Sequence, residues 1–351
     1  MNSRERFFAL LDDRPIDHLV FMPITMMFAA HHIGEKYGKY ALDHRIMANA
    51  QIRLAKDYNI DHVSVITETR EAPDCGAKVR FFDDQPYVID ESSLLLNDKS
   101  ILVKLKCPSP YHSRYMCDRL DGIVYLKKEV GDEKIIEGWV EGPCAAAADI
   151  RGLQALMMDF YEDARFVGEL LEFVLELAVD FGKAQIEAGA DVIGIGDAAA
   201  SLIGPQLYNE YVWPMEKRLI EALHKAGAKI RLHICGDIRH ILEPIDRLGC
   251  EIIDIDSMVP MSEARAKTDP KTCLLGGVDP VSVLQNGTPQ EILDEITKCH
   301  RQAGPQYIVG AGCEVTPGTL PANLRVLADY AHNAGREGHR GVYRTSPGLN
   351  R

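Results

Sequence analysis

Short runs of apolar residues, rich in Val and Ile, alternate along the chain with longer segments whose apolar positions have helical spacing. Eight of the short runs are predicted to be strands, at residues 18–25, 62–67, 135–141, 191–197, 229–235, 251–256, 273–279 and 307–313. Nearly continuous apolar strands separated by helices are typical of a parallel sheet that is buried on both faces. Eight such strand–helix units in 351 residues predict an α/β fold, a (β/α)8 TIM barrel.

The helical segments are most regular in the second half of the chain. They are expected at residues 205–227, 237–249, 262–268, 289–304 and 321–335. Several of them end on Gly, which adopts the left-handed conformation that closes a helix. Four begin near Pro or Asp, which are favoured at helix N-termini. The alternation expected of a barrel is therefore most complete in this half.

The first half is less regular. Between the second and third predicted strands, residues 78–90 and 100–108 alternate apolar and polar positions, which indicates antiparallel β-structure. We interpret this part as a β-rich insertion around residues 76–112 in a single domain of residues 1–351, a barrel with an elaborated N-terminal half. A doubly wound two-domain enzyme is the alternative, but no G-x-G-x-x-G motif opens a helix after an early strand.

The net charge and the cysteines indicate where the protein acts and which partners are excluded. The net charge of -13 is spread along the chain, which argues against a nucleic-acid backbone as partner and leaves a basic protein surface or simple solubility as explanations. The nine cysteines are irregularly spaced, and no apolar leader follows MNSRERFFAL, so we expect a reduced, cytoplasmic protein without a disulfide framework. No apolar run reaches the roughly 18 residues that span a bilayer, so we expect no membrane partner.

Three residues with metal-binding side chains follow two of the predicted strands. His233 and Cys235 end one strand, and Cys313 ends the last. Side chains two apart on a strand point to the same side, so we expect all three at the rim where barrel active sites form. Two thiolates and one imidazole favour Zn²⁺ with an open position. The alternative is a set of buried structural residues or a closed structural zinc, for which His240 and Cys250 are poorly placed as a fourth ligand.

Several segments of the chain resemble a known family. They are EGPCAAAADIRGLQALMMDFYEDARFV at 141–167, GIGDAAASLIGPQLYNEYVWPMEKRLIEAL at 194–223, LHICGD at 232–237, LLGGVDP at 274–280 and GAGCEVTPGTLPANLRVL at 310–327. With these motifs the chain resembles the uroporphyrinogen decarboxylase superfamily, within it the branch of cobamide-dependent methyltransferases that includes the methylcobamide:coenzyme M methyltransferases. The resemblance covers most of the chain from residue 135 onward. It implies a (β/α)8 barrel and zinc on His233, Cys235 and Cys313.

The resemblance also implies an activity. A corrinoid protein is the expected partner, and the methyl group moves between its corrinoid and a small substrate, for which a zinc-activated thiol such as coenzyme M is expected. One alternative is demethylation of a small methylated donor to load the corrinoid, and tetrahydrofolate as acceptor is a variant. Porphyrinogen decarboxylation is a distant alternative, because no arginine lies between Arg14 and Arg45 to bind the substrate carboxylates.

Acidic side chains gather at the predicted strand ends. They are Glu68, Glu141, Asp197, Asp237, Asp256, Asp279 and Glu314. Metal-bound imidazole usually donates its second N–H to a carboxylate, so Asp197, Asp256 or Asp279 is expected to orient His233, with helix capping as the alternative role. Asp197, Asp279 and Glu314 are the catalytic candidates, and a bend after Cys313 would make Glu314 a fourth, displaceable ligand.

Two further residues are candidates for binding the substrate or the corrinoid. His31 lies in a Met-rich segment after the first predicted strand. Tyr208 lies in GPQLYNEY, at a position that recurs in the family that the chain resembles. For Tyr208, packing in the core is the alternative role. Both remain cofactor-binding candidates on sequence grounds.

Overall fold

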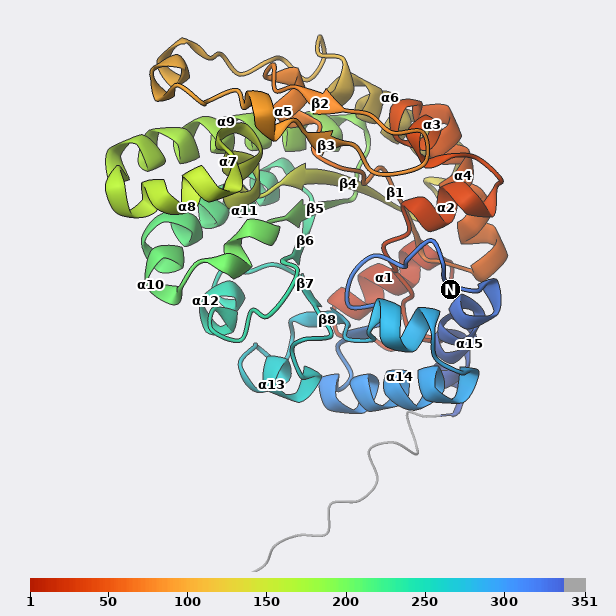
Figure 1. The fold of residues 1–351 in the computed structure, drawn as a ribbon. Helices are drawn as coiled ribbons and strands as arrows, with labels where there is room; N and C mark the ends of the chain where they lie inside the picture. Colours follow the sequence, from red (N-terminus) through yellow and green to blue (C-terminus); the bar gives the residue numbers. More distant parts are fainter. Residues whose placement is uncertain (338–351) are drawn as a thin grey trace, which may run out of the picture.

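The computed structural model describes residues 1–337 and contains a curled parallel sheet surrounded by helices (Figure 1). The seven strands of this sheet are β1 (His62–Ser64), β4 (Ile135–Glu141), β5 (Val192–Gly196), β6 (Lys229–His233), β7 (Ile252–Ile255), β8 (Cys273–Gly276) and β9 (Tyr307–Ile308). They pair in chain order, each parallel to the next. This is a TIM-barrel-like α/β fold, and the predicted order of its strands is confirmed from residue 62 onward.

The first predicted strand, at 18–25, is the exception. Its only β-contact is a bridge between Phe21 and Val309, and the Asp61 N–H donates to the Phe21 carbonyl on the other side. The Phe21 N–H donates to the Asp61 carboxylate instead of to a strand, and Pro23 has no N–H to donate. The segment therefore lies between the edge strands β9 and β1 without a regular ladder, and the prediction of a closed eight-stranded barrel is corrected to seven strands.

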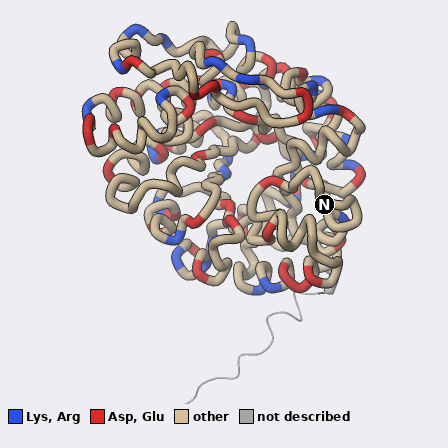
Figure 2. Tube along the Cα trace, in the orientation of Figure 1, with Lys and Arg blue, Asp and Glu red and all other residues tan. Residues whose placement is uncertain are grey.

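Helices form the outer layer of the barrel (Figure 1). They are α1 (Ser3–Leu11), α2 (Met27–His32), α3 (Tyr37–Leu42), α4 (His44–Tyr58), α5 (Glu71–Asp74), α6 (Tyr115–Val130), α7 (Pro143–Arg151), α8 (Leu153–Glu162), α9 (Ala164–Ala188), α10 (Pro205–Leu207), α11 (Trp213–Ala226), α12 (Leu242–Asp246), α13 (Met261–Ala266), α14 (Pro289–Ala303) and α15 (Pro321–Glu337). Among the described residues, no helix is long and apolar enough to cross a membrane. Acidic and basic positions are interspersed around the periphery in the view of Figure 2.

The insertion has less β-structure than expected. Only β2 (Val79–Arg80) and β3 (Val88–Ile89) pair, as an antiparallel hairpin of two residues per strand. The second expected β-segment, 100–108, instead contributes to the 3-10 helix η2 (Lys99–Lys104), whose start is capped by the Asp98 carboxylate accepting from the Ser100 N–H. A side-chain cap gives the backbone a local hydrogen bond in place of one from a neighbouring strand. The alternation of apolar and polar residues therefore predicted β-structure where the chain forms a short helix.

The two ends of the barrel are filled differently. At the N-terminal end, Phe7 and Leu10 of α1 pack on buried strand residues such as Ile252. At the C-terminal end, the Trp139 ring lies over β5, where a Cβ on Gly194 would be 2.0 Å from it. A glycine at 194 is therefore required by space, and the indole packs beside the functional residues described next.

Candidate metal centre and adjoining cavity

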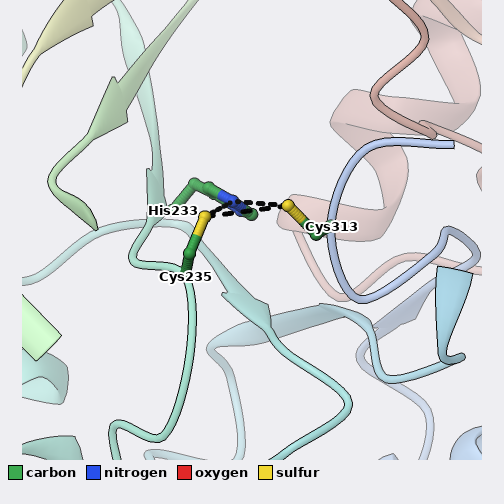
Figure 3. A group of neighbouring side chains, drawn as sticks. All are labelled: His233, Cys235 and Cys313. Atoms are coloured by element: carbon green, nitrogen blue, oxygen red, sulfur yellow. Dashed lines mark hydrogen bonds between the residues drawn. The ribbon is translucent and has the colours of Figure 1, made fainter. Parts of the chain in front are cut away.

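His233, Cys235 and Cys313 point toward one another at the C-terminal end of the sheet (Figure 3). His233 ends β6 and Cys235 follows it by two residues, while Cys313 lies in the loop after β9. Their ligand atoms all lie within 4.8 Å of one another. The structure thus brings together the three residues that the sequence singled out, from segments 78 positions apart.

The distances within this cluster fit a zinc ion. Tetrahedral zinc, with bonds of about 2.3 Å to sulfur and about 2.0 Å to nitrogen, separates two sulfurs by about 3.8 Å and nitrogen from sulfur by about 3.5 Å. The two Sγ atoms are 3.7 Å apart, and Cys313 Sγ is 3.6 Å from His233 Nε2. The Nε2 to Cys235 Sγ distance of 3.0 Å is shorter and is that of a hydrogen bond. Among the described residues, no fourth His, Cys, Asp or Glu joins the set.

Hydrogen bonds within the cluster shift the pKa values of its three groups. The hydrogen bond from Cys235 lowers the pKa of Cys313 to about 4, although burial opposes the thiolate, and the same contact raises the pKa of Cys235. Burial opposes the charged form of His233, but hydrogen bonds to Asp254 and Cys313 raise its pKa to about 9. A thiolate is therefore already favoured at Cys313, and a metal ion binds in place of the protons on the other two groups.

Asp254 holds the other side of the His233 ring. His233 Nδ1 lies 2.9 Å from Asp254 Oδ2, in the neighbouring strand β7. Because Leu232 pairs with Ile253 in the β6–β7 ladder, the next step in register places His233 beside Asp254. The expectation that Asp197, Asp256 or Asp279 orients this imidazole is therefore wrong.

A buried charge network lies beneath the metal centre. Arg231, two residues before His233, donates to both carboxylate oxygens of Asp254 and, at 3.1 Å, to Glu137. The Arg231 side chain is 0% exposed. Burial works against ionisation of Asp254, but the guanidinium and the imidazole together lower its pKa. Asp254 is thereby kept as a carboxylate, which is the form that accepts the His233 N–H.

A cavity of about 570 Å³ opens beside the cluster. Cys235 and Gly236 form one wall, and α7 with the 3-10 helix η3 (Ala198–Leu202) forms another. The acidic side chains in its lining are Glu68, Glu91, Glu141 and Asp149. The cavity is large enough for a small organic substrate that reaches Cys235.

Asp197, Tyr208 and Asp279 lie close to this region but contact other groups. Asp197 is fully buried and accepts the backbone N–H groups of Cys144 and Ala145 at the start of α7. Tyr208, also fully buried, donates to Glu216. Asp279 caps the π-helix η5 (Pro280–Gln285). The capping and packing roles considered for these residues are the ones their contacts support, and none of the three lines the cavity.

Glu314 and His31 are also held by contacts of their own. Glu314 Oε1 accepts the Met27 N–H at 2.9 Å, and burial raises the pKa of this carboxyl to about 7. Its oxygens are outside the set of ligand atoms around His233. His31, in α2, lies with Nε2 2.9 Å from Asp84 and does not line the cavity. The structure thus brings neither residue into the metal cluster.

Three functional side chains were not found from the sequence. Asp254 and Arg231 lie inside apolar strands, whereas the acids considered were those at strand ends. The available signal was a charged residue at an inward position between apolar neighbours, as in IIDID and IRLH. Asp149 lies within α7, where only the turn of the helix shows that it faces the cavity.

Asp254→Asn is expected to weaken zinc binding about 10- to 100-fold, because the neutral amide neither fixes the imidazole tautomer nor supports its basicity. Competition with a chromophoric chelator measures this affinity. Asp256→Asn is the matched control, since Asp256 accepts backbone N–H groups from Gly236 and Met258 and does not contact His233. Equal affinity in Asp254→Asn and the unaltered protein would rule out the orienting role.

Comparison with known proteins identifies a family and related enzymes. The uroporphyrinogen decarboxylase (URO-D) family model matches residues 2–334. The chain is 30% identical to the methylcobamide:CoM methyltransferase MtbA of Methanosarcina mazei in an alignment of 346 positions that covers 94% of this chain and 97% of that protein. It is 29% identical to a uroporphyrinogen decarboxylase of Chlorobium phaeovibrioides over 51% of this chain and 52% of that one.

A solved structure shows the same fold. A methyltransferase from Methanosarcina mazei superposes with a TM-score of 0.86 at 18% sequence identity, covering 94% of this chain and 98% of that one. At that identity the likeness speaks for the fold alone. The family model, by contrast, matches nearly the whole chain, and this protein therefore belongs to the uroporphyrinogen decarboxylase family.

Proposed function

We propose that this protein is a corrinoid-dependent methyltransferase, which moves a methyl group between the corrinoid of a partner protein and a small thiol held at a zinc ion. The observation that carries the proposal is the cluster of His233, Cys235 and Cys313 beside a cavity. Three protein ligands leave one position of a tetrahedral zinc for a substrate, whereas a structural zinc has four. Similarity to a methylcobamide:CoM methyltransferase supports the reaction class.

The chain's residues hold and orient the reacting groups. Zinc, when bound, supplies the positive charge that turns a thiol into a thiolate near neutral pH. Asp254 fixes the His233 ring, and Trp139 packs near the imidazole, with 6.3 Å between the ring centres. In the transfer, the thiolate sulfur forms a bond to the methyl carbon as the cobalt–carbon bond breaks. Both electrons of that bond stay on cobalt, which changes from cobalt(III) to cobalt(I), and the thiol proton goes to solvent.

Porphyrinogen decarboxylation is disfavoured by the lining of the cavity. Its substrate carries several carboxylates, which need Arg or Lys partners. None of the residues that line the cavity is Arg, Lys or His. A polycarboxylate would therefore meet the carboxyl groups of Glu68, Glu141 and Asp149 and no basic residue of the lining.

The direct test uses free methylcobalamin with a thiol. The zinc-loaded protein is expected to convert methylcobalamin to cobalt(I) corrinoid under anaerobic conditions, followed by absorbance, and to form the methyl thioether in equal amount. A chelator should stop the reaction and added zinc should restore it. If no thiol reacts while a methylated donor methylates cobalt(I) corrinoid, the thiol assignment is wrong and the reverse direction replaces it.

Exposed apolar side chains on the loops that follow the strands fit a docking partner. Met258, after β7, is 61% exposed, and Leu320, after β9, is 60% exposed. Loops at the carboxyl ends of parallel strands share one edge of the sheet, so both residues lie on the face where the cavity opens. Contiguous apolar patches on a surface mark protein contacts, and we propose that these two side chains belong to the contact with the corrinoid protein.

Met258→Asp and Leu320→Asp are expected to slow methyl transfer from a methylated corrinoid protein at least about 10-fold, because each places a charge in a desolvated contact. With free methylcobalamin the rate should change less than about 2-fold. Val124→Asp, at an exposed apolar position of α6, is the control. Equal slowing of both reactions would place these side chains outside a docking surface.

A further inference from the structure

The cavity beside the metal centre is lined by acids and lacks basic residues. Glu141 ends β4, and Asp149 lies on α7, so the two carboxyls come from different elements. Glu68 lines the cavity from the segment after β1. All three residues line the space that a substrate would fill.

Glu141 is the centre of this arrangement. Side chains two apart on a strand share a face, so Glu137, Trp139 and Glu141 all point into the barrel from β4. Within the described residues, the Glu141 carboxyl has no hydrogen bond or ion pair from another side chain. Burial raises its pKa well above the usual value, and the charges that add to this shift are all carboxylates, namely Asp149, Glu71, Asp197 and Glu68. The raised pKa favours the neutral acid, and a cation bound beside Glu141 would restore the carboxylate.

Glu68 adds an unsatisfied acceptor. Its Oε1 accepts the Tyr37 hydroxyl at 2.7 Å, whereas Oε2 is buried and has no hydrogen-bond partner. Leaving a buried carboxylate oxygen without a donor is costly, so native structures rarely do so. Glu68 thus brings to the lining of the cavity a carboxyl group with one unmatched acceptor.

The ligand implied by these groups is an organic cation and not a second metal ion. A metal needs its ligand oxygens within a few ångström of one another, and in the described chain only His233, Cys235 and Cys313 form such a set. The acids are instead spread around a space of about 570 Å³. An ammonium group on a small molecule fills such a space and donates to several carboxylates.

We propose that the substrate thiol carries a positive charge, as an aminothiol, and that its ammonium group binds between Glu141, Asp149 and Glu68 while its sulfur reaches the metal beside Cys235. This inference rests on the proposed function and specifies its substrate. A thiol with a sulfonate group, such as coenzyme M, would place its negative charge among carboxylates. The acidic lining of the cavity thus favours a cationic substrate, and the metal favours a thiol.

Three thiols with the same two-carbon chain test the charge preference: 2-aminoethanethiol, 2-mercaptoethanol and 2-mercaptoethanesulfonate. With free methylcobalamin, kcat/KM for the aminothiol is expected to exceed that for the sulfonate at least about 100-fold. The neutral thiol should be intermediate. Equal or higher kcat/KM for the sulfonate or the neutral thiol would overturn the inference, while transfer to either would leave the proposed function standing.

A pair of variants separates charge recognition from intrinsic thiol reactivity. Glu141→Gln keeps the shape of the side chain and should reduce the preference for the aminothiol over the neutral thiol about 10-fold. Glu129→Gln, at an exposed position of α6, should leave this ratio unchanged. An unchanged ratio in Glu141→Gln would exclude Glu141 as the charge-selecting group and with it the proposed site.

Calorimetry of the zinc-loaded protein gives a readout that does not need turnover. The aminothiol should bind at least about 10-fold more tightly than the sulfonate, and Glu141→Gln should remove most of that difference. If no thiol is methylated yet this preference is found, the proposed function fails and the charge inference stands. If the sulfonate binds as tightly as the aminothiol, the charge inference fails whatever the activity.

Discussion

Replacing Cys235 by Ala or Cys313 by Ser should reduce zinc from about one ion per chain to a small fraction and lower methyl transfer at least about 1000-fold. Each substitution removes one of two thiolates from a three-ligand site, and the remaining pair of ligands cannot hold the ion in competition with buffer. Metal analysis by mass spectrometry after gel filtration measures the zinc content, and methylcobalamin demethylation measures the activity.

Cys117→Ser is the control for these two variants. Cys117 is a free, partly exposed cysteine on α6 and lies outside the metal cluster. It should keep its zinc and its activity. Full metal retention in both Cys235→Ala and Cys313→Ser would overturn the assignment of the cluster as a zinc site, and with it the role of zinc in the proposed reaction.

Arg231→Met is expected to lower the free energy of unfolding by about 3–5 kcal/mol, because it leaves the Glu137 and Asp254 carboxylates buried without their cation. The side chain of Met fills a similar space, so the loss of charge dominates over the loss of packing. Urea denaturation followed by circular dichroism measures the change, with the zinc concentration held fixed since zinc binds the folded state.

The matched control is an ion pair at the surface. Arg165 and Glu169, one turn apart on α9, are joined at 2.8 Å, and the Arg165 side chain is 89% exposed. Arg165→Met should change the free energy of unfolding by no more than about 0.5 kcal/mol, because exposed pairs contribute little. A loss of similar size in both variants would mean that burial of the Arg231 network does not decide its contribution.

The order of the strands could be predicted because each buried parallel strand carries its own apolar run. The absence of a regular strand between β9 and β1 could not be predicted. The run at 18–25 is as apolar as the others, but the Asp61 carboxylate takes the Phe21 N–H, and this contact joins residues 40 positions apart. The pattern of apolar residues within a segment does not reveal a contact with a residue far away in the sequence. The apolar run therefore predicted a strand where the structure has a single bridge.

The same distinction applies to the site. His233 and Cys235 were predictable as a pair because strand periodicity places them on one side, and Cys313 because it follows another strand. The carboxylate that contacts His233 was not predictable, because the register between β6 and β7 decides which residue lies beside it. The acidic lining of the cavity also required the structure, since Glu68, Glu141 and Asp149 meet there from three separate segments of the chain.

The contact between Trp139 and β5 has a consequence for how this protein can evolve. The indole lies where a side chain at position 194 would lie, and residue 194 is its direct neighbour in the ladder. An alanine at 194 is therefore tolerated only after the indole has been lost, and loss of the indole leaves a void that a larger residue at 194 would fill. Among descendants of this chain, we expect the two positions to change together.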